Sequence, residues 1–280
     1  MVAPELVRGT SRGVTLLGDP IRPGGVTLTF TERVGGVSAG CYESLNLGSR
    51  VGDDPDSVRE NRRRALVAVG AGSLQDRLVC PNQVHGDRVV VVGGDCLTVE
   101  EAQGEVAKGC DAVVCLEPNV PVLLCYADCV PVVLVAEGGF AVIHSGWKGT
   151  RARISGKALH VLMQKTCCDP ALVRVYIGPH IGVEDYEVSE ELANTFAEEF
   201  GSGVIAGERN LDLAAAIRAT LEEEGVPPAS IACVRESTAS HTDRFFSYRA
   251  QGGSCGRHGA LAWMSDDPAK LDGDWLQQRA

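Results

Sequence analysis

The chain has 280 residues, 44% of them hydrophobic and 22% charged, which is typical of a folded globular protein and not of a disordered one. Its formal net charge of −11 disfavours non-specific binding to nucleic acid, because the overall field repels phosphates. No apolar run is long enough for a membrane span, and the opening "MVAPELVRGTSRG" lacks the apolar segment of a secretion signal. We therefore expect a cytoplasmic protein without nucleic-acid or membrane partners. Eleven scattered cysteines with no CxxC pair indicate free thiols.

The N-terminal third predicts one long helix among strands and loops. Residues 1–25 have weak periodicity and predict an arm or an edge strand, so the first regular strand is expected at "VTLTF". The glycine-rich segment that follows predicts a long loop. Asp54 as N-cap, Pro55 at the first helical position and Gly70 as the stop predict a helix between them. Two short strands are expected around "PNQVHGD", which places His85 beside a turn.

The remainder predicts a mixture of strands and helices without strict alternation. Four apolar runs, "DAVVCL", "PVLLCYA", "PVVLVA" and "FAVIHS", predict four strands, and a helix is expected from about Arg151 to Lys165. Further strands are expected at "VRVYIG", "IACVRE" and "ALAWM", with helices at "SEELANTFAEEF" and "DLAAAIRATLEEEG". This order favours an α+β (mixed α/β) fold, with mixed β-sheets and flanking helices in a single domain.

The runs "PVVLVA" and "FAVIHS" predict a β-hairpin that brings Cys129 toward His144. Depending on where the two-residue turn lies, His144 pairs with Val133 or with Pro131. Proline cannot donate a hydrogen bond within a central strand, so we expect "ADCVP" to turn away from the hairpin and fold the thiol inward.

His85 is the best placed third partner, since it also lies at a strand end beside a turn. One cysteine and two histidines suit a catalytic zinc site that leaves a fourth position open. The same residues suit a cysteine nucleophile with a histidine base. A buried thiol near two structural histidines is the third interpretation, and the spacing alone leaves all three open.

Three short blocks, "QVHG", "YADCVP" and "HSGWKG", resemble in order and spacing the signatures of the YfiH/DUF152 family. This family is also called the laccase-domain or multicopper polyphenol oxidase family, and it has purine nucleoside phosphorylase members. The segments "YIGPHIGVEDYEVSEEL" and "RFFSYRAQGGSCGRHGALAWM" are similar to further family motifs. The resemblance implies a YfiH-like catalytic domain at residues 26–266, between the arm at 1–25 and a C-terminal tail at 267–280.

The resemblance also implies that His85, Cys129 and His144 are catalytic residues that bind one zinc ion. It implies phosphorolysis of purine nucleosides (adenosine, inosine, guanosine and methylthioadenosine) to base and ribose 1-phosphate, with adenosine deamination as a second activity. Zinc lowers the pKa of a bound water, which suits the deamination. Copper is disfavoured, because laccase chemistry needs several coppers and many histidines, whereas this chain has six histidines.

The phosphate is expected at the turn "SGWKGTR", which leads into a helix and offers backbone N–H groups beside Lys148 and Arg151. The alternative is that the glycines only permit the turn and the cations are solvated. The family usually has arginine where Lys148 stands, so the bidentate fork is missing there. The full set of expected substrate-binding residues comprises Asn46, Arg62, Lys148, Arg151, Ser247 and Arg249.

Two other functions remain open from the sequence. One is a cysteine or zinc hydrolase that edits peptidoglycan precursors, in which Cys129 attacks the amide of a UDP-MurNAc-amino acid with a histidine as base. The other is a non-catalytic protein whose zinc only stabilises the fold; that would require a fourth protein ligand, and we identify none.

Overall fold

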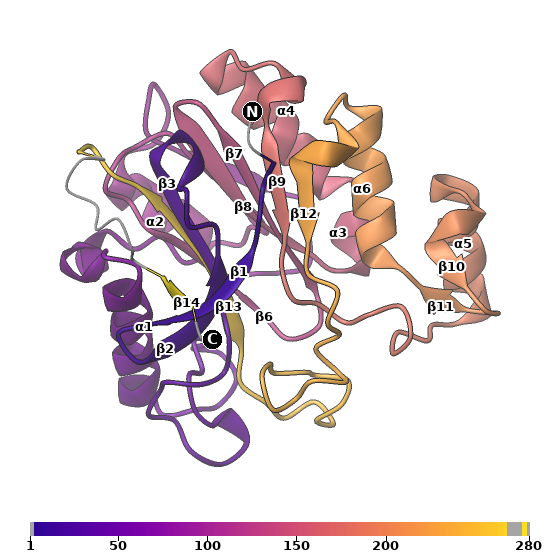
Figure 1. Cartoon of the computed structure of the whole chain (residues 1–280), viewed down its shortest axis with the longest axis horizontal. Coiled ribbons are helices and arrows are strands. Elements are labelled where there is room, and N and C mark those ends of the chain that lie inside the picture. The colour runs from indigo at the N-terminus through magenta and orange to yellow at the C-terminus, as the bar shows by residue number, and fades with distance from the viewer. Residues whose placement is uncertain (1–2, 268–275, 279–280) are drawn as a thin grey trace.

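The computed structural model describes residues 3–267 and 276–278, and two six-stranded β-sheets form its centre (Figure 1). The first sheet has the strand order β14-β1-β2-β3-β13-β6, and all of its adjacent pairs are antiparallel. Its strands are β1 (Val7–Ser11), β2 (Val14–Gly18), β3 (Val26–Thr31), β6 (Val122–Tyr126), β13 (His258–Met264) and β14 (Gln277–Gln278).

The second sheet is mixed, with the order β12-β9-β7-β8-β5-β4. Its two outermost pairs are parallel and the inner pairs antiparallel. Its strands are β4 (Val89–Val92), β5 (Ala112–Cys115), β7 (Val130–Ala136), β8 (Gly139–Ser145), β9 (Arg174–Ile177) and β12 (Ile231–Cys233). A separate two-stranded ribbon consists of β10 (Ile205–Ala206) and β11 (Asn210–Leu211).

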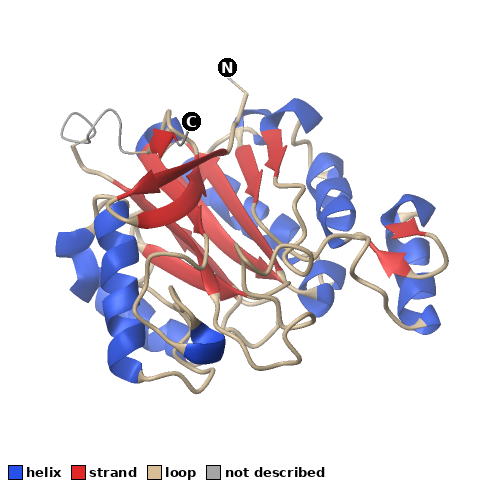
Figure 2. Cartoon of the chain, turned by 60° about the horizontal axis from the view of Figure 1, so that its bottom comes forward, coloured by secondary structure: helices blue, strands red, loops and turns tan. Residues whose placement is uncertain are grey.

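Six α-helices flank these sheets in the described part of the chain (Figure 2). They are α1 (Pro55–Ala68), α2 (Val99–Ala107), α3 (Trp147–Arg151), α4 (Ile154–Thr166), α5 (Glu190–Phe200) and α6 (Leu213–Glu223). Helix α1 lies on the outer face of the first sheet, and α4 and α6 lie on the outer face of the second. The architecture is thus the predicted α+β domain with mixed sheets and flanking helices.

Alternation along the central strands explains why the two sheets stack. In β7, Val133 and Val135 face the core between the sheets, whereas Val132 and Leu134 face the helices α4 and α6. All seven residues of β7 and of β8 are buried, because both faces of these strands are covered. This burial is the physical reason that both strands appear in the sequence as continuous apolar runs.

The N-terminal segment differs from the expectation of an arm or edge strand. Residues 7–18 form the hairpin β1–β2 inside the first sheet, and β2 is buried along its whole length. The expected C-terminal tail contributes the short strand β14, which pairs with β1, while residues 268–275 and 279–280 lie outside the described part. Of the two strands expected around "PNQVHGD" only β4 forms, since Val79 makes a single bridge to Val122.

Helix α1 begins and ends as predicted: the side chain of Asp54 accepts the N–H of Ser57, and Gly70 has a φ of 79°. The helix expected from Arg151 to Lys165 is divided. A five-residue helix α3 precedes α4, and Arg153 between them takes a left-handed φ of 55°. Helix α2 was not predicted. No helix in the described residues is long and apolar enough to cross a membrane.

Candidate metal centre and its pocket

The hairpin β7–β8 and one loop bring His85, Cys129 and His144 together. His144 is the penultimate residue of β8 and pairs with Pro131, the second of the two registers considered. One potential ligand atom from each of the three residues lies within 4.8 Å of the others, and the rings of His85 and His144 meet edge to face at 4.9 Å. The three predicted residues therefore form one cluster.

Pro131 does not turn away from the strand as expected. It lies within β7, and its carbonyl accepts the N–H of Gly178 at 2.9 Å. The nitrogen of Pro131 lies on the same side of the strand as its carbonyl, toward the end of β9. The N–H group that proline lacks would therefore not have paired with β8. Cys129 is consequently placed by the residues before the strand and not by a bend at the proline.

A buried carboxylate, that of Asp111, joins two members of the cluster. Its Oδ1 lies 2.8 Å from Nδ1 of His144, and its oxygens accept the backbone N–H groups of Val84, His85 and Gly86 at 2.7–3.2 Å. These hydrogen bonds hold the loop in which His85 takes a φ of 57°. With Nδ1 of His144 bonded to Asp111, the remaining ring nitrogen Nε2 is left for the cluster.

Cys129 follows Asp128, which has an unusual φ of 88° for a residue with a side chain. The Asp128 carboxylate accepts the hydroxyl of Thr238 and the backbone N–H of Arg249, each at 2.7 Å. Asp128 therefore braces the connection between the two sheets, from which Cys129 projects.

The turn after β8 also depends on the cluster. A Cβ atom at Gly146 would lie 3.0 Å from Sγ of Cys129 and 3.3 Å from Cδ2 of His85. Both separations are shorter than the normal van der Waals distance of about 3.5–4.0 Å. Gly146 is thus required by the close approach of the backbone to the cluster and not only by the turn.

Charge within the cluster favours a thiolate. Burial opposes ionisation of Cys129, but the charge and hydrogen bonds of His144 and His85 outweigh it and lower the pKa of the thiol to about 6. Burial likewise opposes a charge on His144, whereas the Cys129 thiolate and the Asp111 carboxylate raise its pKa to about 9. Both shifts favour a thiolate on Cys129 beside a protonated His144, and the thiolate is the form of cysteine that binds metals.

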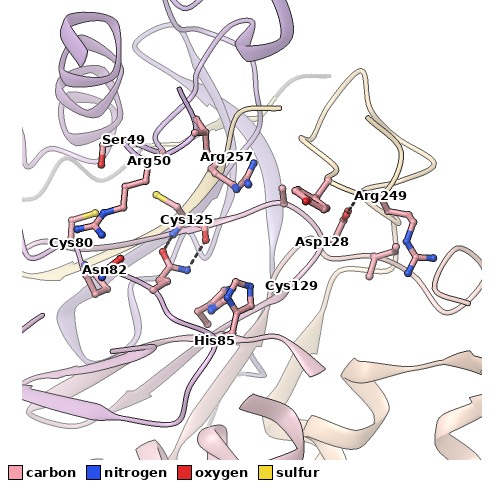
Figure 3. Close-up of a pocket in the computed structure, with 18 of the residues that line it drawn as sticks. Ser49, Arg50, Cys80, Asn82, His85, Cys125, Asp128, Cys129, Arg249 and Arg257 are labelled. Atoms are coloured by element: carbon pink, nitrogen blue, oxygen red, sulfur yellow. Dashed lines mark hydrogen bonds between the residues drawn. The ribbon is translucent and has the colours of Figure 1, made fainter. Parts of the chain in front are cut away.

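The cluster opens into a cavity of about 740 Å³ between the ends of the two sheets (Figure 3). Its walls combine three chemical types: arginines, aromatic side chains and thiols. The arginines are Arg50, Arg62, Arg249 and Arg257, the aromatics are Trp147, Tyr186 and Tyr248, and the additional thiols are Cys80 and Cys125. A cavity of this size suits a ligand as large as a nucleoside.

The six expected substrate-binding residues divide into three groups of two. Arg62 and Arg249 line the cavity. Asn46 and Ser247 are fully buried behind it: Oδ1 of Asn46 accepts the N–H of Arg257 at 2.8 Å, and Oγ of Ser247 accepts the N–H of Ala250 at 3.1 Å. They support the walls of the cavity from behind.

Lys148 and Arg151 are not among the residues that line the cavity. Lys148 is exposed and lies 5.4 Å from the centre of the Trp147 ring, and Arg151 pairs with Glu199 at 2.8 Å. The ion pair with Glu199 holds Arg151 outside the lining of the cavity, and Lys148 lies beside Trp147, which does line it.

The sequence patterns did not indicate several residues of the site. Asp111 begins the apolar run "DAVVCL", and a polar residue directly before a buried strand was the available signal. Arg50 and Arg257 lie in glycine-rich segments whose course the sequence did not reveal. Their common position at the cavity depends on contacts between distant segments, such as that of Asn46 with Arg257.

Comparison with known proteins shows the family to which the chain belongs. The family described as "Multi-copper polyphenol oxidoreductase laccase" matches residues 27–265. The chain belongs to this family, known also as the YfiH family. A relative from Deinococcus radiodurans, named purine nucleoside phosphorylase, is 37% identical over 259 residues, which are 90% of this chain and 94% of the relative.

Solved structures of YfiH-family proteins have the same fold. YlmD from Geobacillus stearothermophilus superposes with a TM-score of 0.82 and 31% identity, covering 94% of this chain and all of that protein. The Bacillus licheniformis protein YfiH gives a TM-score of 0.80 at 26% identity, over 91% of this chain and 97% of its own. The resemblance seen in the sequence is therefore confirmed.

The cluster fits one metal ion. Zinc binds thiolate sulfur at about 2.3 Å and imidazole nitrogen at about 2.0–2.1 Å, so ligand atoms at tetrahedral angles lie about 3.5 Å apart. Two imidazoles and a thiolate within 4.8 Å match this donor set and scale. Within the described residues this is the one group of three or more histidine, cysteine or acidic side chains whose ligand atoms could hold a metal ion together.

Proposed function

We propose that this protein is a zinc-dependent purine nucleoside phosphorylase. Adenosine, inosine, guanosine or methylthioadenosine would react with phosphate to give the free base and the corresponding ribose 1-phosphate, with adenosine deamination as a second activity. Relatives named purine nucleoside phosphorylase support the reaction class. The observation that carries the proposal is one cavity in which the metal-binding cluster meets four arginines and three aromatic side chains.

The residues of the cavity suit the two substrates. Phosphorolysis breaks the bond from the anomeric carbon to the purine nitrogen, with the electron pair leaving on the purine, and forms a carbon–oxygen bond to phosphate. The arginines supply positive charge for the phosphate within a chain of net negative charge. The faces of Trp147, Tyr186 and Tyr248 offer stacking surfaces for a purine.

The metal ligands would be His85, Cys129 and His144, and Asp111 would hold the proton on Nδ1 of His144. When bound, zinc supplies a Lewis acid at the reacting centre. Tyr126 packs against His144 with the ring centres 5.5 Å apart, and its hydroxyl donates to the carbonyl of Ile143 at 2.9 Å. These contacts fix the imidazole before any ligand arrives.

The direct test combines metal analysis with nucleoside assays. Purified wild type should contain about one zinc per chain and should release hypoxanthine from inosine only when phosphate is present. Cys129→Ala should lose the metal and at least about 100-fold of the rate, since it removes a ligand. Cys168→Ala is the matched control, because that thiol donates to the carbonyl of Asp169 and is not among the residues that line the cavity. Adenosine without phosphate tests for deamination through the appearance of inosine. A folded, zinc-loaded sample that leaves every nucleoside unchanged would contradict the proposal.

One observation favours a second candidate, the cysteine hydrolase of peptidoglycan precursors. Asp111, His144 and Cys129 form a continuous chain of hydrogen bonds, in the order carboxylate, imidazole and thiolate. This order matches that of a cysteine nucleophile with an oriented histidine. The thiolate would attack the amide carbonyl of a UDP-MurNAc-amino acid, His144 would protonate the leaving amine, and water would then hydrolyse the thioester. This activity would need neither phosphate nor His85, so His85→Ala and a chelator separate the two candidates.

A further inference from the structure

One end of the cavity concentrates positive charge from three separate segments. Arg50 comes from the long loop before α1, Arg62 from α1 itself and Arg257 from the residue before β13. In Figure 3, Arg50 and Arg257 lie on one side of Cys125, with His85 and Cys129 on the other, and Arg249 lies apart beyond Asp128. The charges of Arg62 and Arg50 both act on Cys80, and those of Arg62 and Arg257 both act on Cys125. The three arginines therefore lie at one end of the cavity, which we call the arginine end.

These three cations lack carboxylate partners among the residues that the structure describes. Arg62 donates to the carbonyl of Leu47 at 2.9 Å and to Oγ of Ser49 at 3.3 Å. Arg257 donates to the carbonyls of Cys255 and Gly256 at 2.8 and 2.9 Å. These contacts orient the guanidinium groups without neutralising them.

The rest of helix α1 shows how unusual this is. Arg59 pairs with Asp56, and Arg63 and Arg64 both pair with Glu60. Arg62 alone of these four lines the cavity, and no described carboxylate forms an ion pair with it. In a chain with 37 acidic and 26 basic side chains, a carboxylate-free group of guanidinium groups indicates a site for an anionic ligand.

The charges of these arginines also affect the pKa of Cys80, a thiol that lines the cavity. A hydrogen bond with Cys125, helped by the charges of Arg62 and Arg50, outweighs burial and lowers the pKa of Cys80 to about 6. Opposite charge stabilises a thiolate in the same way that it stabilises an oxyanion. The charges of Arg62 and Arg50 thus act in the direction that favours an anion, and the planar donor forks of arginine match phosphate oxygens.

We propose that Arg50, Arg62 and Arg257 form the binding subsite for the phosphate oxyanion. The assignment of that oxyanion to inorganic phosphate and ribose 1-phosphate rests on the proposed function. If the protein acts instead on nucleotide-linked precursors, the same chemistry accommodates a diphosphate. Either way the subsite lies at the arginine end and not at the turn that carries Lys148 and Arg151.

The test measures binding directly, so that it does not depend on turnover. Isothermal titration of the zinc-loaded protein with inorganic phosphate, and separately with uridine diphosphate, identifies the source of the oxyanion. Arg50→Gln, on an exposed loop, should weaken binding of the preferred ion about tenfold or more, and Arg257→Lys should weaken it less than Arg257→Gln, because the charge remains while the fork is lost. Arg63→Gln, the neighbour of Arg62 paired with Glu60, makes the same charge change outside the cavity and should leave binding unchanged.

A kinetic measurement separates this proposal from the proposed function. With phosphorolysis present, Arg50→Gln should raise the KM for phosphate about tenfold and leave the KM for inosine within about twofold. Phosphorolysis whose phosphate KM responds to Lys148→Gln but to neither Arg50→Gln nor Arg257→Gln would overturn the subsite and leave the phosphorylase standing. Oxyanion binding that depends on these arginines without nucleoside turnover would retain the subsite and refute the phosphorylase. If Arg63→Gln weakened oxyanion binding equally, the effect would come from the overall charge of the protein, and the subsite would be refuted.

Discussion

Oδ1 of Asp111 lies 2.8 Å from Nδ1 of His144, and the same carboxylate accepts three backbone N–H groups from the loop that carries His85. Burial opposes ionisation of Asp111, but the hydrogen bonds from His144 and from the loop outweigh it and lower its pKa. One side chain thereby positions two of the three cluster residues, which come from different parts of the chain.

Replacement of Asp111 should weaken metal binding without abolishing the fold. Asp111→Asn keeps the size of the side chain but removes the charge and one acceptor oxygen, so His144 and the loop lose part of their orientation. We expect zinc affinity to fall about 10- to 100-fold, as for other carboxylates that orient metal-binding histidines. Competition with a chelator measures this affinity. Asp95→Asn, at an exposed carboxylate paired with Lys165, serves as the control, and equal affinity of the two variants would contradict the role of Asp111.

Gly146→Ala should disturb the cluster through space alone. The added methyl group would press on Cys129 and His85, at 3.0 and 3.3 Å from their nearest atoms, so we expect lower zinc affinity with little change in secondary structure. Gly104→Ala is the matched control: it lies within α2 with open space around its Cβ position, and should stabilise the protein by up to about 1 kcal/mol. Unchanged zinc affinity in Gly146→Ala would show that the turn moves to make room for the methyl group, and would contradict this prediction.

Cys80, which lines the cavity, should react faster than the buried thiols of Cys110 and Cys115 in the zinc-loaded protein. Its pKa of about 6 makes it a thiolate at neutral pH, whereas burial raises the pKa of Cys110 and of Cys115 to about 12. Mass spectrometry after brief treatment with iodoacetamide at pH 7 should find Cys80 alkylated well before the other two. Inorganic phosphate should slow this reaction if it occupies the arginine end. Alkylation of Cys80 only at the rate of Cys110 would argue against a positive field there.

His258 should make the protein sensitive to acid. The imidazole is fully buried between Tyr126 and Phe245, and burial lowers its pKa to about 3. The unfolded chain, with an ordinary histidine pKa near 6.5, binds the proton more readily than the folded protein. The contribution of His258 to the free energy of unfolding is therefore complete above pH 6.5 and is lost as pH falls toward 3. Between these two pH values, the free energy of unfolding should fall by up to about 1.4 kcal/mol for each pH unit because of this group.

Urea unfolding at pH 7, 6 and 5 measures this dependence. His258→Phe should remove that part of the slope, because the replacement has no proton to gain. His160→Gln, at an exposed imidazole beside Glu224, should keep nearly all of it. An unchanged slope in His258→Phe would assign the acid sensitivity to other groups.

The local elements could be read from the sequence because their signals lie within a few residues of one another. Asp54 and Pro55 start α1, Gly70 follows its end, and the apolar runs of β5 to β8 appear as predicted. The hairpin β1–β2 was missed, since its polar side chains, such as Thr10 and Thr15, obscure the strand pattern. The break at Arg153 was also missed, because no glycine or proline marks it.

The three cluster residues were identified from the sequence because the blocks that contain them resemble the signatures of the family; their spacing alone left their role open. Only the tertiary structure decided what surrounds them. Asp111, Arg50 and Arg257 reach the cavity through hydrogen bonds and sheet packing between segments far apart in the chain, and no local pattern encodes those contacts. Lys148 and Arg151 illustrate the converse: they follow the cluster closely in sequence, yet neither is among the residues that line the cavity, and Arg151 pairs with Glu199. The residue types of the centre are therefore determined locally, whereas the positions of its charges are determined by the fold.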